Sequence, residues 1–94
     1  SEILNKLKGF VNVSNMTSHN GNDIPNQFII NFENGRIFKS YNSNIVIKTE
    51  GKTYLGTNWD YSKTTGKYRN DFLGETKKET EAKIKAGAYI LLED

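Results

Sequence analysis

The most informative segment of this 94-residue sequence is Gln27-Phe28-Ile29-Ile30-Asn31-Phe32-Glu33-Asn34-Gly35-Arg36-Ile37-Phe38-Lys39-Ser40-Tyr41. Two runs of mostly β-branched and aromatic residues flank Asn34-Gly35, a pair that favours the two-residue type I′ loop of a β-hairpin. This register pairs Glu33 with Arg36 and places Phe28 opposite Tyr41. One face then carries large apolar side chains: Phe28, Ile30, Phe32, Ile37 and Tyr41. We therefore expect an antiparallel hairpin whose apolar face belongs to the core.

Further strands are expected on both sides of this hairpin. Residues 45–49 and 52–55 are again rich in strand-forming residues, and Glu50-Gly51 separates them, which predicts a second hairpin. Residues 88–92 form a short apolar run after Gly87 and predict a last strand. Residues 11–18 alternate weakly and are compatible with a first strand.

Three segments have helical patterns. Apolar residues at positions 3, 4, 7, 10 and 11 lie on one face of a short amphipathic helix. Thr64 or Thr65 can cap a second helix that stops at Gly74. Thr76-Lys77-Lys78-Glu79 has the form of a capping box and starts a third helix, which Gly87 ends.

These elements together predict an α+β domain, with a largely antiparallel sheet of about five strands built from hairpins and two or three short helices. A chain of 94 residues has the size of one domain, so we expect a single domain over residues 1–94. Within it, we expect residues 1–15 to form an N-terminal helical extension and residues 16–92 to form the α+β core.

The composition excludes several classes of protein. The chain has no cysteine, which excludes a disulfide framework and a thiolate metal site. No apolar run approaches the ~18 residues that span a bilayer, and the first residues lack the layout of a signal peptide. We therefore expect an intracellular protein. The net charge of +2 is too small to indicate nucleic-acid binding by itself.

Residues suited to catalysis are few. His19 is the single histidine and falls in a predicted turn, with no cysteine or second histidine to complete a nucleophile relay or a ligand set. The carboxylates are scattered, and Asp60 and Asp71 lack the spacing of metal ligands. No glycine-rich phosphate loop is present. We therefore expect a protein that is not an enzyme and that uses no metal or cofactor.

The strongest candidate for binding is the segment 59–74, which interleaves aromatic rings with cations that we expect to face solvent. The binding residues that we select from it are Trp59, Tyr61, Lys63, Lys67 and Arg69. Aromatic and cationic side chains suit a single-stranded nucleic acid, because bases stack on rings and phosphates pair with cations. The same residue types dominate protein–protein hot spots. In a third interpretation, the rings pack on the sheet and the cations form a solvated rim.

A second candidate surface is the segment 39–44. Its small polar side chains suit a recognition surface, and they suit a solvated turn between strands equally well.

Several motifs carry a resemblance to a known group of proteins: Thr17-Ser18-His19-Asn20-Gly21-Asn22, Asn26-Gln27-Phe28, Phe38-Lys39-Ser40-Tyr41-Asn42-Ser43, Trp59-Asp60-Tyr61-Ser62, Lys67-Tyr68-Arg69-Asn70 and Phe72-Leu73-Gly74. Through them, residues 16–91 resemble a family of short uncharacterised proteins encoded by phages and mobile elements of low-GC bacteria. The resemblance implies a setting in an infected host cell and carries no catalytic residues. In that setting, small accessory proteins often occlude a host enzyme or defence complex, as anti-CRISPR proteins do.

We therefore hypothesise a non-enzymatic phage or mobile-element accessory protein in the cytoplasm of the host cell. It would bind a host protein or nucleoprotein and inhibit host defence, without a membrane partner. The alternative is a small single-stranded nucleic-acid-binding module that uses residues 59–72. A nuclease or toxin is a more distant alternative, because paired histidines or acidic metal ligands are missing.

Overall fold

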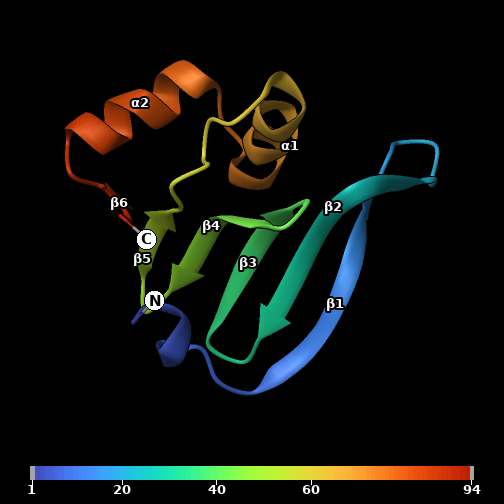
Figure 1. Cartoon of the computed structure of the whole chain (residues 1–94), viewed down its shortest axis with the longest axis horizontal. Helices are drawn as coiled ribbons and strands as arrows, with labels where there is room; N and C mark the ends of the chain where they lie inside the picture. The colour runs from blue at the N-terminus through green and yellow to red at the C-terminus, as the bar shows by residue number, and fades with distance from the viewer. Residues whose placement is uncertain (1, 94) are drawn as a thin grey trace.

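The computed structural model describes residues 2–93. In this part of the chain, a 3-10 turn is followed by six strands and two α-helices (Figure 1). Their bounds are η1 (Leu4–Lys6), β1 (Phe10–Thr17), β2 (Asp23–Phe32), β3 (Gly35–Ser40), β4 (Ser43–Thr49), β5 (Lys52–Leu55), α1 (Lys63–Leu73), α2 (Lys77–Lys85) and β6 (Tyr89–Leu91). The α+β class is confirmed, and the sheet has six strands where about five were expected.

The strands form one sheet in the order β1-β2-β3-β4-β5-β6. Each strand from β1 to β5 runs antiparallel to the next, whereas β6 runs parallel to β5. A parallel pair needs a crossover connection, because the chain must return to the starting end of the sheet. Helices α1 and α2 form this crossover and lie together on one side of the sheet (Figure 1).

The register predicted for the β2–β3 hairpin is wrong. Phe32 lies opposite Gly35 and Phe28 lies opposite Lys39, so the loop is Glu33-Asn34. Positive φ angles occur elsewhere among the described residues but not at Asn34 or Gly35, so these two do not form a type I′ turn.

Tertiary contacts explain the different register. The Asn34 side chain accepts a hydrogen bond from the backbone amide of Lys8 at 2.7 Å and donates one to the Lys6 carbonyl at 2.7 Å. A Cβ atom on Gly35 would collide with the Lys48 carbonyl and with the side chain of Leu7. Both residues therefore contact the N-terminal segment, and these tertiary contacts override the preference of Asn-Gly for a type I′ turn.

The second predicted hairpin is confirmed. Thr49 pairs with Lys52, and the loop residues Glu50 and Gly51 have φ angles of 54° and 73°. Positive φ at both loop positions is the geometry of a type I′ turn, whose twist matches that of the strands.

The helix predicted over residues 3–11 is wrong beyond Lys6. Helical structure is confined to the turn η1, and strand β1 begins at Phe10. The physical reason is that Ile3, Leu4 and Leu7 pack on the sheet, while Gly9, at a φ angle of 68°, redirects the chain into β1.

The ends of the two α-helices follow the sequence signals except at the start of α1. The side chain of Ser62, not of Thr64 or Thr65, caps α1 by accepting a hydrogen bond from the Thr65 amide, and Gly74 ends the helix with a φ angle of 69°. Thr76 and Glu79 form the predicted capping box of α2. Neither helix in residues 2–93 is long and apolar enough to cross a membrane.

Both faces of the sheet are buried at its central strands β3 to β5, whereas the hairpin pattern predicted one buried face. The face under the helices centres on Phe38, Ile45, Val46 and Leu55. The opposite face centres on Ile37, Ile47 and Tyr54, and the N-terminal segment around Leu7 covers it. Because successive side chains of β3 and β4 point to opposite faces, both faces carry apolar residues. The helices α1 and α2 therefore pack on one face and η1 packs on the other.

Candidate binding cleft

The five residues selected from the sequence do not form one surface. Arg69 is 1% exposed and Trp59 is half-buried, whereas Tyr61, Lys63 and Lys67 are exposed. The expectation that all the cations of this segment face solvent is therefore wrong for Arg69.

Arg69 is buried because its guanidinium forms hydrogen bonds with groups of the loop that precedes α1. Its Nη1 donates to the Trp59 carbonyl at 2.7 Å and its Nη2 donates to the Asn70 side chain at 3.0 Å. The guanidinium also lies over the Trp59 ring, 5.1 Å from the ring centroid, and forms an ion pair with Asp60 at 3.4 Å. Arg69 thus holds the Trp59-Asp60 segment against α1.

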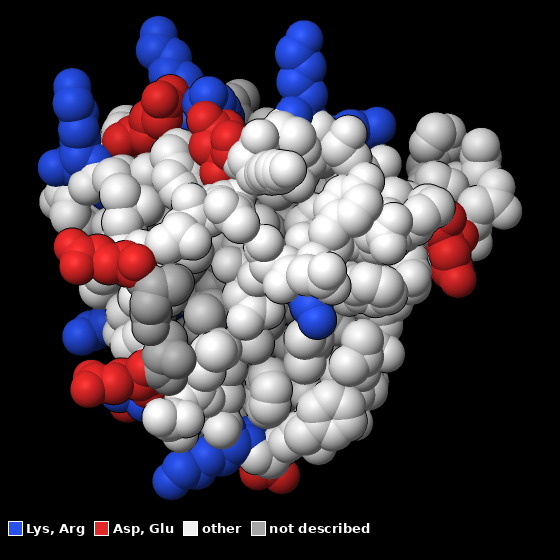
Figure 2. All heavy atoms as spheres, viewed as in Figure 1, with Lys and Arg blue, Asp and Glu red and all other residues white. Residues whose placement is uncertain are grey.

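Lys63 and Lys67 lie on the solvent side of α1, in a shallow groove of about 460 Å³ that also contains Lys77, Asp60 and Asp71. The Nζ of Lys77 lies 2.7 Å from the Asp60 carboxylate. This hydrogen bond holds the pKa of Asp60 below its ordinary value, against the opposing effect of burial, and Arg69 lowers it further. Figure 2 shows the same mixture at the top of the molecule, where cationic and acidic side chains stand close together over the helices.

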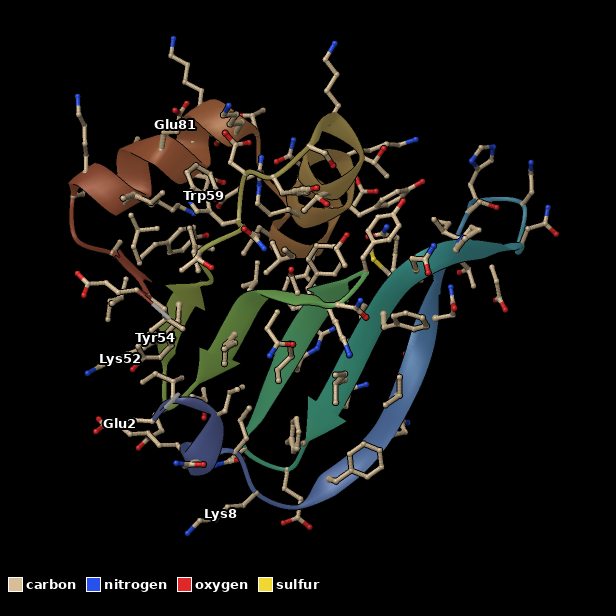
Figure 3. The ribbon with its side chains drawn as sticks, viewed as in Figure 1. Glu2, Lys8, Lys52, Tyr54, Trp59 and Glu81 are labelled. Atoms are coloured by element: carbon tan, nitrogen blue, oxygen red, sulfur yellow. The ribbon has the colours of Figure 1, made fainter. Side chains whose placement is uncertain are left out.

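Trp59 belongs to a different place. Its side chain lies below α2, beside the segment that leaves β5 (Figure 3). There it lines a shallow cleft of about 510 Å³ with Ala82, Ile84 and Leu91, and it also packs against the core under the helices. The interpretation in which the rings of this segment pack on the sheet therefore explains Trp59 better than a role in binding a partner does.

Tyr61 lines a cleft with a volume of about 640 Å³. We name it the Tyr41–Tyr61 cleft, and its lining residues are Ser40, Tyr41, Asn42, Ser43, Ile45, Asn58, Tyr61, Ser62, Thr64 and Thr65. The β3–β4 loop forms one wall and the beginning of α1 forms the other. The cleft thus joins the two candidate segments that sequence analysis treated separately.

The lining carries no charged side chain and mixes polar with apolar surface. Its serine, threonine and asparagine residues supply hydroxyl and amide groups, and two large rings stand at its surface: Tyr41 is 53% exposed and Tyr61 is 69% exposed. Such a lining can donate and accept hydrogen bonds in many directions while the rings provide apolar contact area.

The backbone at Tyr41 is strained. Its φ angle is 55°, in the left-handed region that a bulky side chain rarely adopts. The Tyr41 amide donates a hydrogen bond of 2.7 Å to the carbonyl of Asn26, which itself has a φ angle of 64°. Strain of this kind persists only where surrounding structure imposes it, and it is concentrated at functional sites.

Two hydrogen bonds, one buried and one exposed, fix the two walls relative to each other. The hydroxyl groups of Ser40 and Thr65 lie 3.0 Å apart and are almost fully buried. At the mouth, the Asn58 side chain donates to Ser43 at 2.9 Å. The cleft is therefore preformed by contacts between side chains as well as by the fold.

Gln27, which is opposite Ser40 in the sheet, is fully buried, yet its amide group has no hydrogen-bond partner within the described residues. A buried, unpaired amide lowers stability. Packing alone therefore does not explain a glutamine at this position.

The groups that sequence analysis considered for catalysis remain apart. His19 is exposed in the loop between β1 and β2. Within residues 2–93, no three histidine, aspartate or glutamate side chains lie close enough together to hold a metal ion.

Comparison with known proteins identifies a family. A family model described as "Family of unknown function (DUF8033)" matches residues 11–87, from β1 through α2. The chain belongs to the DUF8033 family. The DUF8033 match includes both walls of the Tyr41–Tyr61 cleft, and the family description assigns them no activity. Neither the curated proteins nor the solved structures contain a match to the chain.

Proposed function

We propose that the protein is a non-enzymatic accessory protein of a phage or mobile element, which binds a host protein or nucleoprotein through the Tyr41–Tyr61 cleft and thereby inhibits host defence. The observation that carries the proposal is a pair of exposed tyrosines in an uncharged cleft of about 640 Å³. The phage setting rests on the resemblance described for residues 16–91.

The chemistry of the cleft favours a protein surface as the partner. Tyrosine supplies large, rigid contact area with little loss of conformational entropy, and serine and asparagine supply adaptable hydrogen bonds. Antibody binding loops use this combination, and the Tyr41–Tyr61 cleft has it on two walls. Because the Ser40–Thr65 contact holds the walls in place, binding requires little ordering of the site.

The second candidate function is binding of a single-stranded nucleic acid, with bases stacked on Tyr61. The groove that contains Lys63, Lys67 and Lys77 favours it, because cations beside aromatic rings suit a phosphate backbone. Two observations weigh against it: Arg69 is buried, and Asp60 and Asp71 share the groove with the lysines. We therefore prefer the protein partner.

The test is affinity capture from a lysate of a low-GC bacterium, with and without nuclease treatment. We compare the unmodified protein with Tyr61→Ala, which removes an exposed ring and leaves the core intact. A captured host protein should persist after nuclease treatment, and Tyr61→Ala should weaken its binding by roughly tenfold or more, as a hot-spot residue does.

A double variant, Lys63→Ala with Lys67→Ala, is the matched control. It should retain the captured protein, since both lysines lie outside the cleft lining. If capture instead requires nucleic acid and is lost in the double variant, with a steep dependence on salt, the nucleic-acid candidate is correct and the proposal is wrong.

A further inference from the structure

Strand β1 is an edge of the sheet, and no other strand in residues 2–93 pairs with its outer side. The eight residues of this strand extend roughly 27 Å at about 3.4 Å per residue. The molecule measures 36 × 32 × 20 Å, and β1 runs from the bottom toward the top of its right-hand side in Figure 1, so the open edge occupies much of that side. Its backbone groups offer a template for another strand.

This edge lacks most of the usual protection against pairing. Proteins protect open edges with charged residues, proline, shortness or bulges. The sequence Phe10–Thr17 contains no charged residue and no proline. The pairing with β2 is irregular only near the two ends of the strand, which leaves Asn12–Asn15 regular in the middle. The opposite edge, β6, is protected by its length of three residues.

Apolar side chains are exposed along the same strand. Phe10, Val11 and Val13 are 63%, 56% and 52% exposed. The ring of Phe10 packs edge-on against Phe32, and Val13 pairs with Ile30. These residues lie on the face whose cluster at Ile37, Ile47 and Tyr54 is covered by the N-terminal segment, but the segment does not extend over β1. Figure 2 shows few charged side chains over β1 and β2, on the right of the molecule.

We propose that β1 pairs antiparallel with β1 of a second copy of this chain, so that two six-stranded sheets become one continuous sheet across a two-fold axis. The lack of charge favours this occupant, because a charge-free strand meets its own copy without like-charge repulsion. A net charge of +2 on each chain adds little long-range repulsion.

The sequence of β1 suits pairing with itself. With the two-fold axis at Val13, this valine faces its own copy, and Asn12 faces Ser14 of the second copy. Phe10 then faces Met16, so that like meets like at these positions, and the one departure is Val11, which faces Asn15. Pairing β1 with β6 would leave a β1 edge free at the end of every assembly and build a filament, whereas pairing β1 with β1 uses both β1 edges and ends at two copies.

Sedimentation velocity from micromolar to near-millimolar protein concentration tests the proposal. We expect the unmodified chain to change from monomer to dimer as concentration rises. Val13→Lys should weaken the dimer by at least roughly tenfold, because it places two lysines opposite each other at the axis. Circular dichroism verifies that this variant is folded, and Val11→Lys, also on β1, repeats the test if it is not.

Leu91→Lys is the matched control, since Leu91 is an apolar residue, 46% exposed, on the other edge strand. It should leave the dimer unchanged. A chain that stays monomeric at every concentration overturns the proposal and leaves the edge to a strand of a different protein. Three other outcomes would also overturn it: a dimer that persists in both Val13→Lys and Val11→Lys, a dimer that Leu91→Lys abolishes, or oligomers that continue to grow with concentration.

Discussion

The guanidinium of Arg69 is buried against the backbone of the segment that it follows in sequence. One hydrogen bond joins α1 to the Trp59 carbonyl, a second reaches the neighbouring Asn70 within the helix, and the guanidinium carbon lies over the Trp59 ring. A lysine cannot reproduce this arrangement, because the planar fork of arginine supplies both the paired donors and the stacking surface.

We predict that Arg69→Ala lowers the free energy of unfolding by roughly 2–4 kcal/mol, because it removes charge-assisted hydrogen bonds and leaves a cavity under Trp59. Lys67→Ala, two residues earlier on the exposed side of the same helix, should change it by less than about 0.5 kcal/mol. Urea denaturation measures both. Equal stability of the two variants would contradict the structural role assigned to Arg69.

At the scale of elements, Glu75 connects α2 to β6. Its carboxylate, 3% exposed, accepts hydrogen bonds from Lys83 at 2.6 Å, from the Tyr89 hydroxyl at 2.8 Å and from Thr80 at 2.5 Å. Burial is the largest single influence and raises the pKa of Glu75, but the hydrogen bonds from Lys83, Thr80 and Tyr89 together outweigh it and lower the pKa. Burial and the hydrogen bond to Glu75 raise the pKa of Tyr89.

The lowered pKa of Glu75 predicts how stability depends on pH. A carboxylate whose pKa is lower in the folded state stabilises the fold fully above its unfolded pKa, about 4.3 for glutamate. This stabilisation is lost as the pH falls through the folded pKa. We therefore expect the free energy of unfolding to fall below about pH 4.3, and Glu75→Gln to make this fall less steep.

Denaturation at several pH values, with Glu81→Gln as an exposed control on α2, measures the effect. Because the pKa of Asp60 is also lowered, we expect the free energy of unfolding of the Glu75 variant still to fall with acid, but less steeply. An unchanged acid slope in Glu75→Gln would show that the network does not act as described.

The sequence predicted elements best where a local signal had no tertiary competitor. The capping box of α2, the end of α1 at Gly74 and the Glu50-Gly51 turn all depend on neighbouring residues alone. The Asn34-Gly35 signal failed because the Asn34 amide binds a segment about 26 residues away in sequence. The same limit applies to the site. The pattern predicted the exposure of Lys63 and Lys67, whereas it left the exposure of Tyr61 open, and burial of Arg69 depends on where the Trp59 carbonyl comes to lie.

At the scale of the whole molecule, the sheet separates two cores. Phe72 of α1 stacks on Phe38 with ring centroids 5.8 Å apart, and Leu7 packs on the Ile37–Ile47–Tyr54 cluster on the opposite face. Because the two sets of contacts share no partner, they should contribute independently to stability.

We predict that Phe72→Ala and Leu7→Ala each lower the free energy of unfolding by roughly 2–3 kcal/mol, since both side chains are partly buried. The double variant should equal their sum within about 0.5 kcal/mol. Phe72→Ala combined with Phe38→Leu is the comparison pair, and it should deviate from additivity because the rings are in contact. Strong coupling between Leu7 and Phe72 would mean that the sheet transmits packing changes from one face to the other.

The parallel pairing of β5 with β6 has a consequence for the order of folding. Neighbours from β1 to β5 follow one another along the chain, so their pairings can form in succession by closing short loops. Thr53 and Tyr89, by contrast, are 36 positions apart (89 − 53), and joining them closes a longer loop for a strand of three residues. We therefore expect the β1–β5 meander to form first and β6 to add to the sheet late. In the folded protein, we correspondingly expect the segment from α2 to β6 to open before the meander does.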